Sequence, residues 1–204
     1  RPAGGAAPHF VHALLSGALA EPSLPGTVEL VTSLDHDLQR ELTVAARATV
    51  DELAPQHVSA ASVVVLDNQS GEILAYVGSP DAANTSRLGG NDGVRARRQP
   101  GSTLKPFVYE LALERLGMSP GTLLPDVELS FTTFDGEPFR PQNYDERFHG
   151  PVLLRDALGN SYNVPAVWVA ERLGPEAVLR QLHRLGFASL DKPAIDYGVG
   201  IALG

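Results

Sequence analysis

The spacing of apolar residues in the first half of the chain predicts one long helix and a pair of strands. From Asp35 onward, apolar side chains recur every three or four residues until Pro55, which indicates an amphipathic helix that ends before this proline. The branched, alternating run at 28–32 predicts a strand before this helix. Two β-rich runs, 61–66 and 72–77, are separated by Asp-Asn-Gln-Ser-Gly and predict an antiparallel hairpin.

The second half of the chain has the pattern of a helical region. Apolar residues on one face between Ser102 and Leu116 predict a second amphipathic helix, with Gly117 in the place of a C-terminal cap. The loop-like segment 79–101 leads to this helix, and 118–150 is expected to be largely irregular. Three shorter helices are predicted after it, at Leu153–Leu158, Ala166–Leu173 and Pro175–Leu185.

The composition limits the class of protein. With 43% hydrophobic and 20% charged residues, 204 residues suffice for one globular domain or most of one. A net charge of -8 and the lack of a basic run interleaved with aromatic residues argue against a nucleic-acid partner. The chain has no cysteine, and its histidines lack a carboxylate-rich partner motif. Neither a metal nor a cofactor is therefore expected.

The ends of the chain have a different character from its centre. Residues 1–26 hold several prolines and glycines around one short apolar stretch, and they predict a linker with one short helix, Phe10–Leu19. No stretch approaches the roughly 18 to 20 apolar residues that a membrane span requires, so this segment is expected to be soluble. The chain starts at Arg1 and ends in a glycine-rich segment, and both ends are expected to be cut from a longer protein.

A serine and a lysine at the start of the second predicted helix have the spacing of a nucleophile beside a base. Residues three apart on a helix share a face, so the Lys105 amine is expected within hydrogen-bonding reach of the Ser102 hydroxyl. A lysine acts as a base only when neutral, and burial lowers its pKa because desolvation disfavours the charged form. This spacing alone arises by chance in about one of eight such sequences. An unremarkable surface serine and lysine therefore remain an alternative.

A second motif, Ser161-Tyr162-Asn163, lies between two predicted helices further along the chain. Its serine adds a second hydroxyl, which can relay a proton between Lys105 and a leaving amine. Its asparagine adds a carboxamide, which can hold a peptide substrate. Like the first motif it is common by chance, but the two motifs complement each other. For the upstream residues Asn143 and Tyr144, lining of a cleft and ordinary loop packing are equally open.

The motifs and their surroundings resemble a known family. The S-x-x-K and S-x-N motifs occur in the order found in penicillin-binding proteins and class A β-lactamases. Segments 67–78 and 100–107 resemble the transpeptidase domain of class A penicillin-binding proteins, and 141–150 and 161–166 resemble its penicillin-binding protein 1C branch. The resemblance extends from about Val28 to the end of the chain.

This resemblance implies an α+β fold of the penicillin-binding protein and serine β-lactamase type. Its helices would pack on an antiparallel sheet that is incomplete in this chain, with the nucleophile at the start of a buried central helix. Residues 1–26 would be the linker from a preceding glycosyltransferase domain. Residues 27–204 would form the N-terminal part of the transpeptidase domain.

The same resemblance implies a peptidoglycan D,D-transpeptidase on the periplasmic face of the bacterial inner membrane, within a membrane-anchored full-length protein. Such an enzyme acylates its serine with a stem peptide that ends in D-Ala-D-Ala, passes the acyl group to an amine on a neighbouring strand, and is trapped by β-lactam antibiotics. At the matching positions, Ser102 would be the nucleophile, Lys105 the base, Ser161 the proton relay and Asn163 the substrate anchor. The backbone amide of Ser102 would be one oxyanion donor.

The chain departs from the family pattern at two places. Tyr162 replaces the aspartate of S-D-N, at a position that varies among such enzymes. No K-T-G or K-S-G follows, because Lys192 is followed by Pro193 and Ala194. In the family this third motif supplies a cation for the substrate carboxylate and a second oxyanion amide, so the chain alone is expected to be catalytically impaired. Two alternatives stay open: a serine β-lactamase or D,D-carboxypeptidase, and a non-catalytic module that uses the fold as a binding scaffold.

Overall fold

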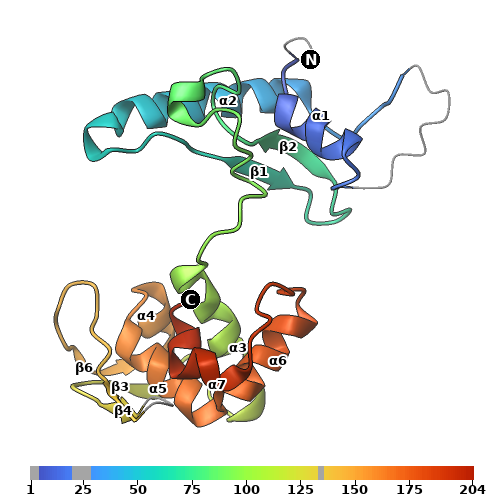
Figure 1. Ribbon diagram of the computed structural model, residues 1–204. Coiled ribbons are helices and arrows are strands. Elements are labelled where there is room, and N and C mark those ends of the chain that lie inside the picture. The colour runs from blue at the N-terminus through green and yellow to red at the C-terminus, as the bar shows by residue number, and fades with distance from the viewer. Residues whose placement is uncertain (1–4, 20–28, 133–135) are drawn as a thin grey trace. The chain divides into compact units, whose positions relative to one another are not determined.

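The computed structural model describes residues 5–19, 29–132 and 136–204, and the chain divides into two compact units, Arg1–Arg97 and Arg98–Gly204 (Figure 1). Both units combine helices with small antiparallel sheets of two strands. Among the described residues, no helix is both long and apolar enough to cross a membrane.

The first unit is built around a β-hairpin. Its described elements are α1 (Pro8–Leu15), α2 (His36–Glu52), β1 (Val63–Leu66), β2 (Ile73–Val77) and two short 3₁₀ helices, Ala54–Gln56 and Thr85–Arg87. The two strands pair antiparallel, with Val63 opposite Val77 and an irregularity in register near Leu66. Both α1 and α2 pack against β2 (Figure 1). In this contact the rings of Phe10 and Tyr76 meet edge to face with their centroids 5.8 Å apart. The predicted hairpin is confirmed.

The long helix α2 begins and ends as the sequence predicts. Asp35 is its N-cap, and its Oδ1 accepts a hydrogen bond from the backbone N–H of Leu38 at 2.9 Å. Such a cap stabilises a helix by about 1 kcal/mol because it satisfies an amide that has no partner within the helix. Ala46 and Val50 are buried and carry the apolar face, and the helix ends three residues before Pro55.

Two predictions for the first unit need correction. The predicted strand at 28–32 is wrong over its described part, 29–32, which is irregular and exposed, with Val31 88% exposed. Strand-forming residues favour a half-buried, paired surface, and these residues lack one. The short helix predicted at Phe10–Leu19 runs instead from Pro8 to Leu15, because proline is well suited to the first helical position. The rest of the predicted linker, 20–26, lies outside the described residues.

The second unit is mainly helical. Its regular elements are a 3₁₀ helix (Gly101–Leu104), α3 (Lys105–Arg115), β3 (Leu123–Asp126), β4 (Phe131–Thr132), β5 (Pro138–Phe139), β6 (Gly150–Leu153), α4 (Leu154–Gly159), α5 (Asn163–Leu173), α6 (Pro175–Arg184), α7 (Ala194–Tyr197) and a second 3₁₀ helix (Gly198–Ala202). Strand β3 pairs with β6 and β4 with β5, both antiparallel. The region predicted to be largely irregular, 118–150, therefore contains strands. They are two to four residues long, too short for an alternating pattern to be recognised.

Helix α3 lies in the core of the second unit. It packs against α4, α5 and α6, beside which it lies in Figure 1. Leu104, Val108 and Leu111 are buried on the face that their spacing predicts, and truncation of such a side chain costs about 2 to 5 kcal/mol. The chain turns away from the helix at Gly117, whose φ of +61° confirms the predicted C-terminal cap. The predicted central helix is thus present, and its first residue is Lys105.

Candidate active site

Ser102 lies in the 3₁₀ turn that leads into α3. The turn begins at Gly101, which has a φ of +57°, a left-handed conformation that glycine adopts without strain. Ser102 is exposed, whereas Lys105 at the first position of α3 is only 1% exposed. The predicted helix thus begins as a 3₁₀ turn and becomes α-helical at Lys105. Pro106 fits the first turn of α3 because its missing N–H would have no partner within the helix.

The Lys105 amine binds to the second motif. Its Nζ donates hydrogen bonds to the backbone oxygen of Ser161 at 2.5 Å, to Ser161 Oγ at 3.1 Å and to Asn163 Oδ1 at 2.6 Å. The carboxamide of Asn163 is oriented by Nδ2, which donates to the carbonyl of Gln142 at 2.7 Å. Three of the four predicted site residues, which lie up to 58 residues apart in sequence, therefore meet around one nitrogen.

Burial lowers the pKa of the Lys105 amine to about 8, because desolvation disfavours its charged form. The three contacts suit both protonation states. An ammonium group donates to all three oxygens, whereas a neutral amine donates to the Ser161 carbonyl and Asn163 Oδ1 and accepts a hydrogen bond from the Ser161 hydroxyl. Between the two states, the Ser161 hydroxyl has only to rotate about its C–O bond. The arrangement can therefore pass a proton between Lys105 and Ser161 without leaving a polar atom unsatisfied.

Ser161 owes its position to the end of α4. Asn160 is the C-cap of α4. The backbone N–H of Ser161 donates to the carbonyl of Leu158 at 3.0 Å, and that of Tyr162 donates to the carbonyl of Ala157 at 2.9 Å. This is the Schellman arrangement, in which the residue after the cap adopts a left-handed conformation and is usually glycine. Ser161 has a φ of +55° in that place, a strained conformation for a residue with a side chain. The chain thus places a serine where helix-ending geometry favours glycine.

The contact predicted between the two residues of the first motif is absent. Among the residues that the structure describes, no hydrogen bond joins the Ser102 hydroxyl to Lys105, whose amine contacts Ser161 and Asn163 instead. Ser102 is nevertheless one helical turn from Lys105 in the chain, at the exposed end of the same element. Hydrogen bonds between a nucleophile and its base are often loose until substrate binds.

Residues outside the two motifs support the site. Asn143, for which the sequence left two readings open, is 4% exposed, and its Oδ1 accepts a hydrogen bond from the backbone N–H of Asn163 at 2.8 Å. Its neighbour Tyr144 is fully exposed, and no hydrogen bond of its side chain is seen among the described residues. Asp126 is buried and binds Asn143, and the sequence alone did not single it out. The only sequence feature that could have drawn attention to Asp126 is its position directly after the apolar run Leu-Leu-Pro.

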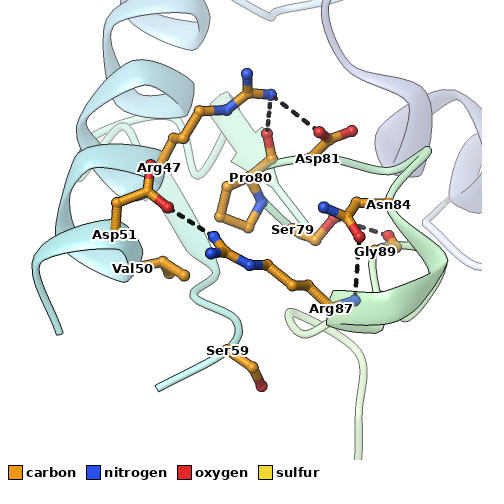
Figure 2. Close-up of a pocket in the computed structure, with 10 residues that line it drawn as sticks. All are labelled: Arg47, Val50, Asp51, Ser59, Ser79, Pro80, Asp81, Asn84, Arg87 and Gly89. Carbon is orange, nitrogen blue, oxygen red and sulfur yellow. Dashed lines mark hydrogen bonds and ion pairs between the residues drawn. The ribbon is translucent and has the colours of Figure 1, made fainter. Parts of the chain in front are cut away.

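A separate hollow lies in the first unit, between α2 and the loop that follows β2 (Figure 2). Its charges are paired within it. Arg47 contacts Asp81 at 3.6 Å and the carbonyl of Pro80 at 3.0 Å, and Arg87 contacts Asp51 at 2.6 Å (Figure 2). None of the residues predicted to carry chemistry lines this hollow.

Comparisons with known proteins identify the family to which the chain is similar. A family described as the penicillin binding protein transpeptidase domain matches residues 61–198, more than half of the chain. Penicillin-binding protein 1C of Escherichia coli (strain K12) is 40% identical over 158 residues, which are 78% of this chain and 20% of that protein. Penicillin-binding protein 1F of Bacillus subtilis (strain 168) is 33% identical over 90% of this chain and 24% of its own length.

A solved structure supports the fold. The crystal structure of penicillin-binding protein 1A from Haemophilus influenzae has a TM-score of 0.62 at 29% identity, over 71% of this chain and 21% of that one. The expected α+β fold of the penicillin-binding type is therefore confirmed, with its helices and small antiparallel sheets. The chain spans about a fifth to a quarter of the length of these curated relatives. On these grounds it belongs to the penicillin-binding protein transpeptidase domain family.

Proposed function

We propose that the protein carrying this chain is a peptidoglycan D,D-transpeptidase, with Ser102 as its acyl-accepting nucleophile. The observation that supports this most is the buried Lys105 amine, held by Ser161 and Asn163 one helical turn after Ser102. A buried lysine with a lowered pKa can act as the base for a serine hydroxyl one helical turn away, once substrate binding brings the two groups together. Membership of the transpeptidase domain family supports the same chemistry.

In the proposed first half-reaction, neutral Lys105 takes the proton of the Ser102 hydroxyl as Oγ attacks the carbonyl carbon of the penultimate D-alanine. The backbone N–H of Ser102, near the start of α3, donates to the oxyanion that forms. The proton passes from Lys105 through the Ser161 hydroxyl to the nitrogen of the terminal D-alanine, the C–N bond breaks, and D-alanine leaves. Asn163 holds the peptide through its carboxamide. An ester of Ser102 remains.

In the second half-reaction an amine of a neighbouring stem peptide attacks this ester. Its proton returns through Ser161 and Lys105 to the Ser102 oxygen, which leaves as the free hydroxyl, and a new peptide bond cross-links the strands. A β-lactam has a strained amide that the same serine opens, and the product is an ester without a departing amine. We further propose that the full-length protein is membrane-anchored, faces the periplasm and carries a glycosyltransferase domain before the linker at 1–26, as the resemblance to class A relatives implies.

The experiment is intact-mass spectrometry of the full-length protein after incubation with penicillin G. The wild type is expected to gain the mass of one antibiotic and to keep it, and the Ser102→Ala variant to gain none. Ser189→Ala, which removes an exposed serine hydroxyl in the same unit, is the matched control and should react like the wild type. An adduct that is rapidly hydrolysed would instead indicate a β-lactamase or carboxypeptidase. No adduct, or one that persists in Ser102→Ala, would favour a non-catalytic scaffold.

A further inference from the structure

A second polar cluster lies behind the Ser161-Tyr162-Asn163 segment and has no part in the proposed proton transfers. It centres on Asp126, the last residue of β3, which is 0% exposed. Its two carboxylate oxygens accept from Asn143 Nδ2 at 2.8 and 2.9 Å, and Oδ2 also accepts from the backbone N–H of His149 at 2.9 Å and lies 2.6 Å from His149 Nδ1. A buried carboxylate is tolerated only when its oxygens are satisfied. These contacts therefore fix Asn143 and His149 relative to the end of β3.

Asn143 caps α5 from a distant part of the chain. The residue before this helix, Tyr162, makes no side-chain capping hydrogen bond. Asn143 Oδ1 instead accepts from the backbone amides of Asn163 and Val164 at 2.8 and 3.3 Å. Pro165 follows and has no N–H, so Asn143 satisfies the first two amide donors of the helix. The start of α5 is thereby tied to Asp126 through one carboxamide.

His149 holds the middle residue of the same segment. Its ring stacks on that of Tyr162 with centroids 4.2 Å apart and an interplanar angle of 18°. Its Nδ1 faces Asp126, and its Nε2 faces Asp145 Oδ2 at 3.1 Å. The ring is thus fixed at both nitrogens and on one face, and the stack gives Tyr162 a partner that the aspartate of S-D-N would not have.

These contacts surround the strained residue of the site. The end of α4 sets the left-handed φ of +55° at Ser161, and the residues after Ser161 must also be held in place for its carbonyl and hydroxyl to stay in contact with Lys105. Tyr162 and Asn163 are those residues. We propose that Asp126, Asn143 and His149 are positioning residues that hold Ser161-Tyr162-Asn163 against Lys105. This role rests on the proposed transpeptidase function.

The first test follows Asn143 in the full-length protein. Two quantities are measured: the second-order rate constant of acylation by a fluorescent penicillin, and the hydrogen-exchange rates of the Asn163 and Val164 amides. Asn143→Ala is expected to lower the acylation rate about tenfold and to speed both exchange rates about tenfold, because a cap and a partner of a buried carboxylate are lost. Acylation is compared at a temperature at which both proteins are fully folded.

An exchange of partners gives a rescue that a general loss of stability would not give. Asn143→Asp alone sets a second carboxylate against Asp126 and is expected to lower acylation at least as much as Asn143→Ala. In the double variant Asp126→Asn/Asn143→Asp the amide of residue 126 again donates to residue 143, but the Arg147 carbonyl loses the hydrogen bond that it accepts from Asn143 Nδ2 at 2.8 Å. The double variant should therefore acylate several-fold faster than Asn143→Asp without reaching the wild-type rate.

The second test separates the ring stack of His149 from the contacts of its two ring nitrogens. His149→Ala is expected to lower the acylation rate several-fold, and His149→Phe, which keeps a ring against Tyr162, to lie between it and the wild type. His183→Ala is the matched control, because His183 is an exposed histidine whose ring binds only the Leu190 carbonyl among the described contacts. It should acylate at the wild-type rate.

The outcomes distinguish this role from the function on which it rests. Wild-type acylation in Asn143→Ala and His149→Ala, with or without faster amide exchange, would overturn the positioning role and leave the transpeptidase proposal intact. A loss in His183→Ala as large as in His149→Ala, or no recovery in the double variant, would also overturn it. No adduct on the wild-type protein would overturn the proposed function, and the positioning role with it.

Discussion

Each unit buries a long polar side chain from a helix. The two side chains differ in whether the groups in their hydrogen bonds can exchange donor and acceptor roles. Gln39 of α2 is 2% exposed and Lys105 of α3 is 1% exposed. Gln39 accepts from the Tyr76 amide at 2.7 Å and donates to the Tyr76 carbonyl at 3.0 Å, so its carboxamide acts as a strand partner for β2. Lys105 binds side-chain and backbone oxygens of the Ser161 and Asn163 segment.

The difference lies in which hydrogen-bonding groups can switch between donor and acceptor. The carboxamide of Gln39 and the backbone groups of Tyr76 have fixed donors and acceptors, so their contact can only stabilise the fold. Lys105 and the Ser161 hydroxyl can each be donor or acceptor, and burial brings the pKa of the lysine to about 8. Burial of a polar side chain is thus a structural feature in one unit and a source of reactivity in the other. The predictions below test this contrast, from the largest effect to the smallest.

The largest effect is expected from Lys105→Met, which keeps a long side chain and removes the amine. Acylation by penicillin should fall about a thousandfold, corresponding to about 4 kcal/mol, because the base is lost. The free energy of unfolding should change by less than about 1 kcal/mol, since a desolvated charge is lost together with its hydrogen bonds. Stopped-flow acylation and urea denaturation measure the two quantities. A wild-type acylation rate would contradict a role for Lys105 as base.

The reverse result is expected for Gln39→Leu. It leaves the buried amide and carbonyl of Tyr76 without a partner and should lower the free energy of unfolding by about 3 kcal/mol. Acylation by penicillin should stay at the wild-type rate at a temperature at which the protein is folded. Arg40→Ala on the same helix is the control and should cost less than about 0.5 kcal/mol, since its ion pair with Asp37 is exposed. A loss of acylation in Gln39→Leu would remove the contrast between the units.

The pH dependence of the acylation rate should follow the deprotonation of Lys105. The neutral fraction of Lys105 grows as pH rises through about 8, so the acylation rate should increase about tenfold between pH 7 and pH 9 and then level off. The folded pKa lies below the ordinary value of 10.5, so the cost of burying the charge is present in full below pH 8 and disappears as pH rises through 10.5. A rate that does not change over this range would exclude Lys105 as the titrating base.

The smallest effect concerns the backbone of Ser161. Ser161→Gly and Ser161→Ala both remove the hydroxyl, and both should acylate slowly. The glycine variant should be more stable than the alanine variant by about 1 kcal/mol, because glycine adopts a φ of +55° without strain. Differential scanning calorimetry compares the two. Equal melting temperatures would show that the left-handed conformation carries no cost.

Much of the fold could be predicted from local sequence. The capped helix after Asp35, the hairpin and the helices of the second unit follow from period and turn chemistry, which act between near neighbours. The strand at 28–32 was wrong because β-rich residues form a strand only when a partner is present. The short strands within 118–150 were missed for the related reason that their partners lie elsewhere in the chain.

The sequence by itself determined which residue types are available for chemistry: a serine and a lysine three positions apart, and a second serine with an asparagine downstream. The tertiary structure alone decided which of them meet. It turned the Lys105 amine toward Ser161 and Asn163, and it placed Asp126 and Asn143 behind α5. The physical reason is that a buried polar group takes whichever partners the packing of α3, α5 and β3 brings within about 3 Å, and sequence spacing does not encode that distance.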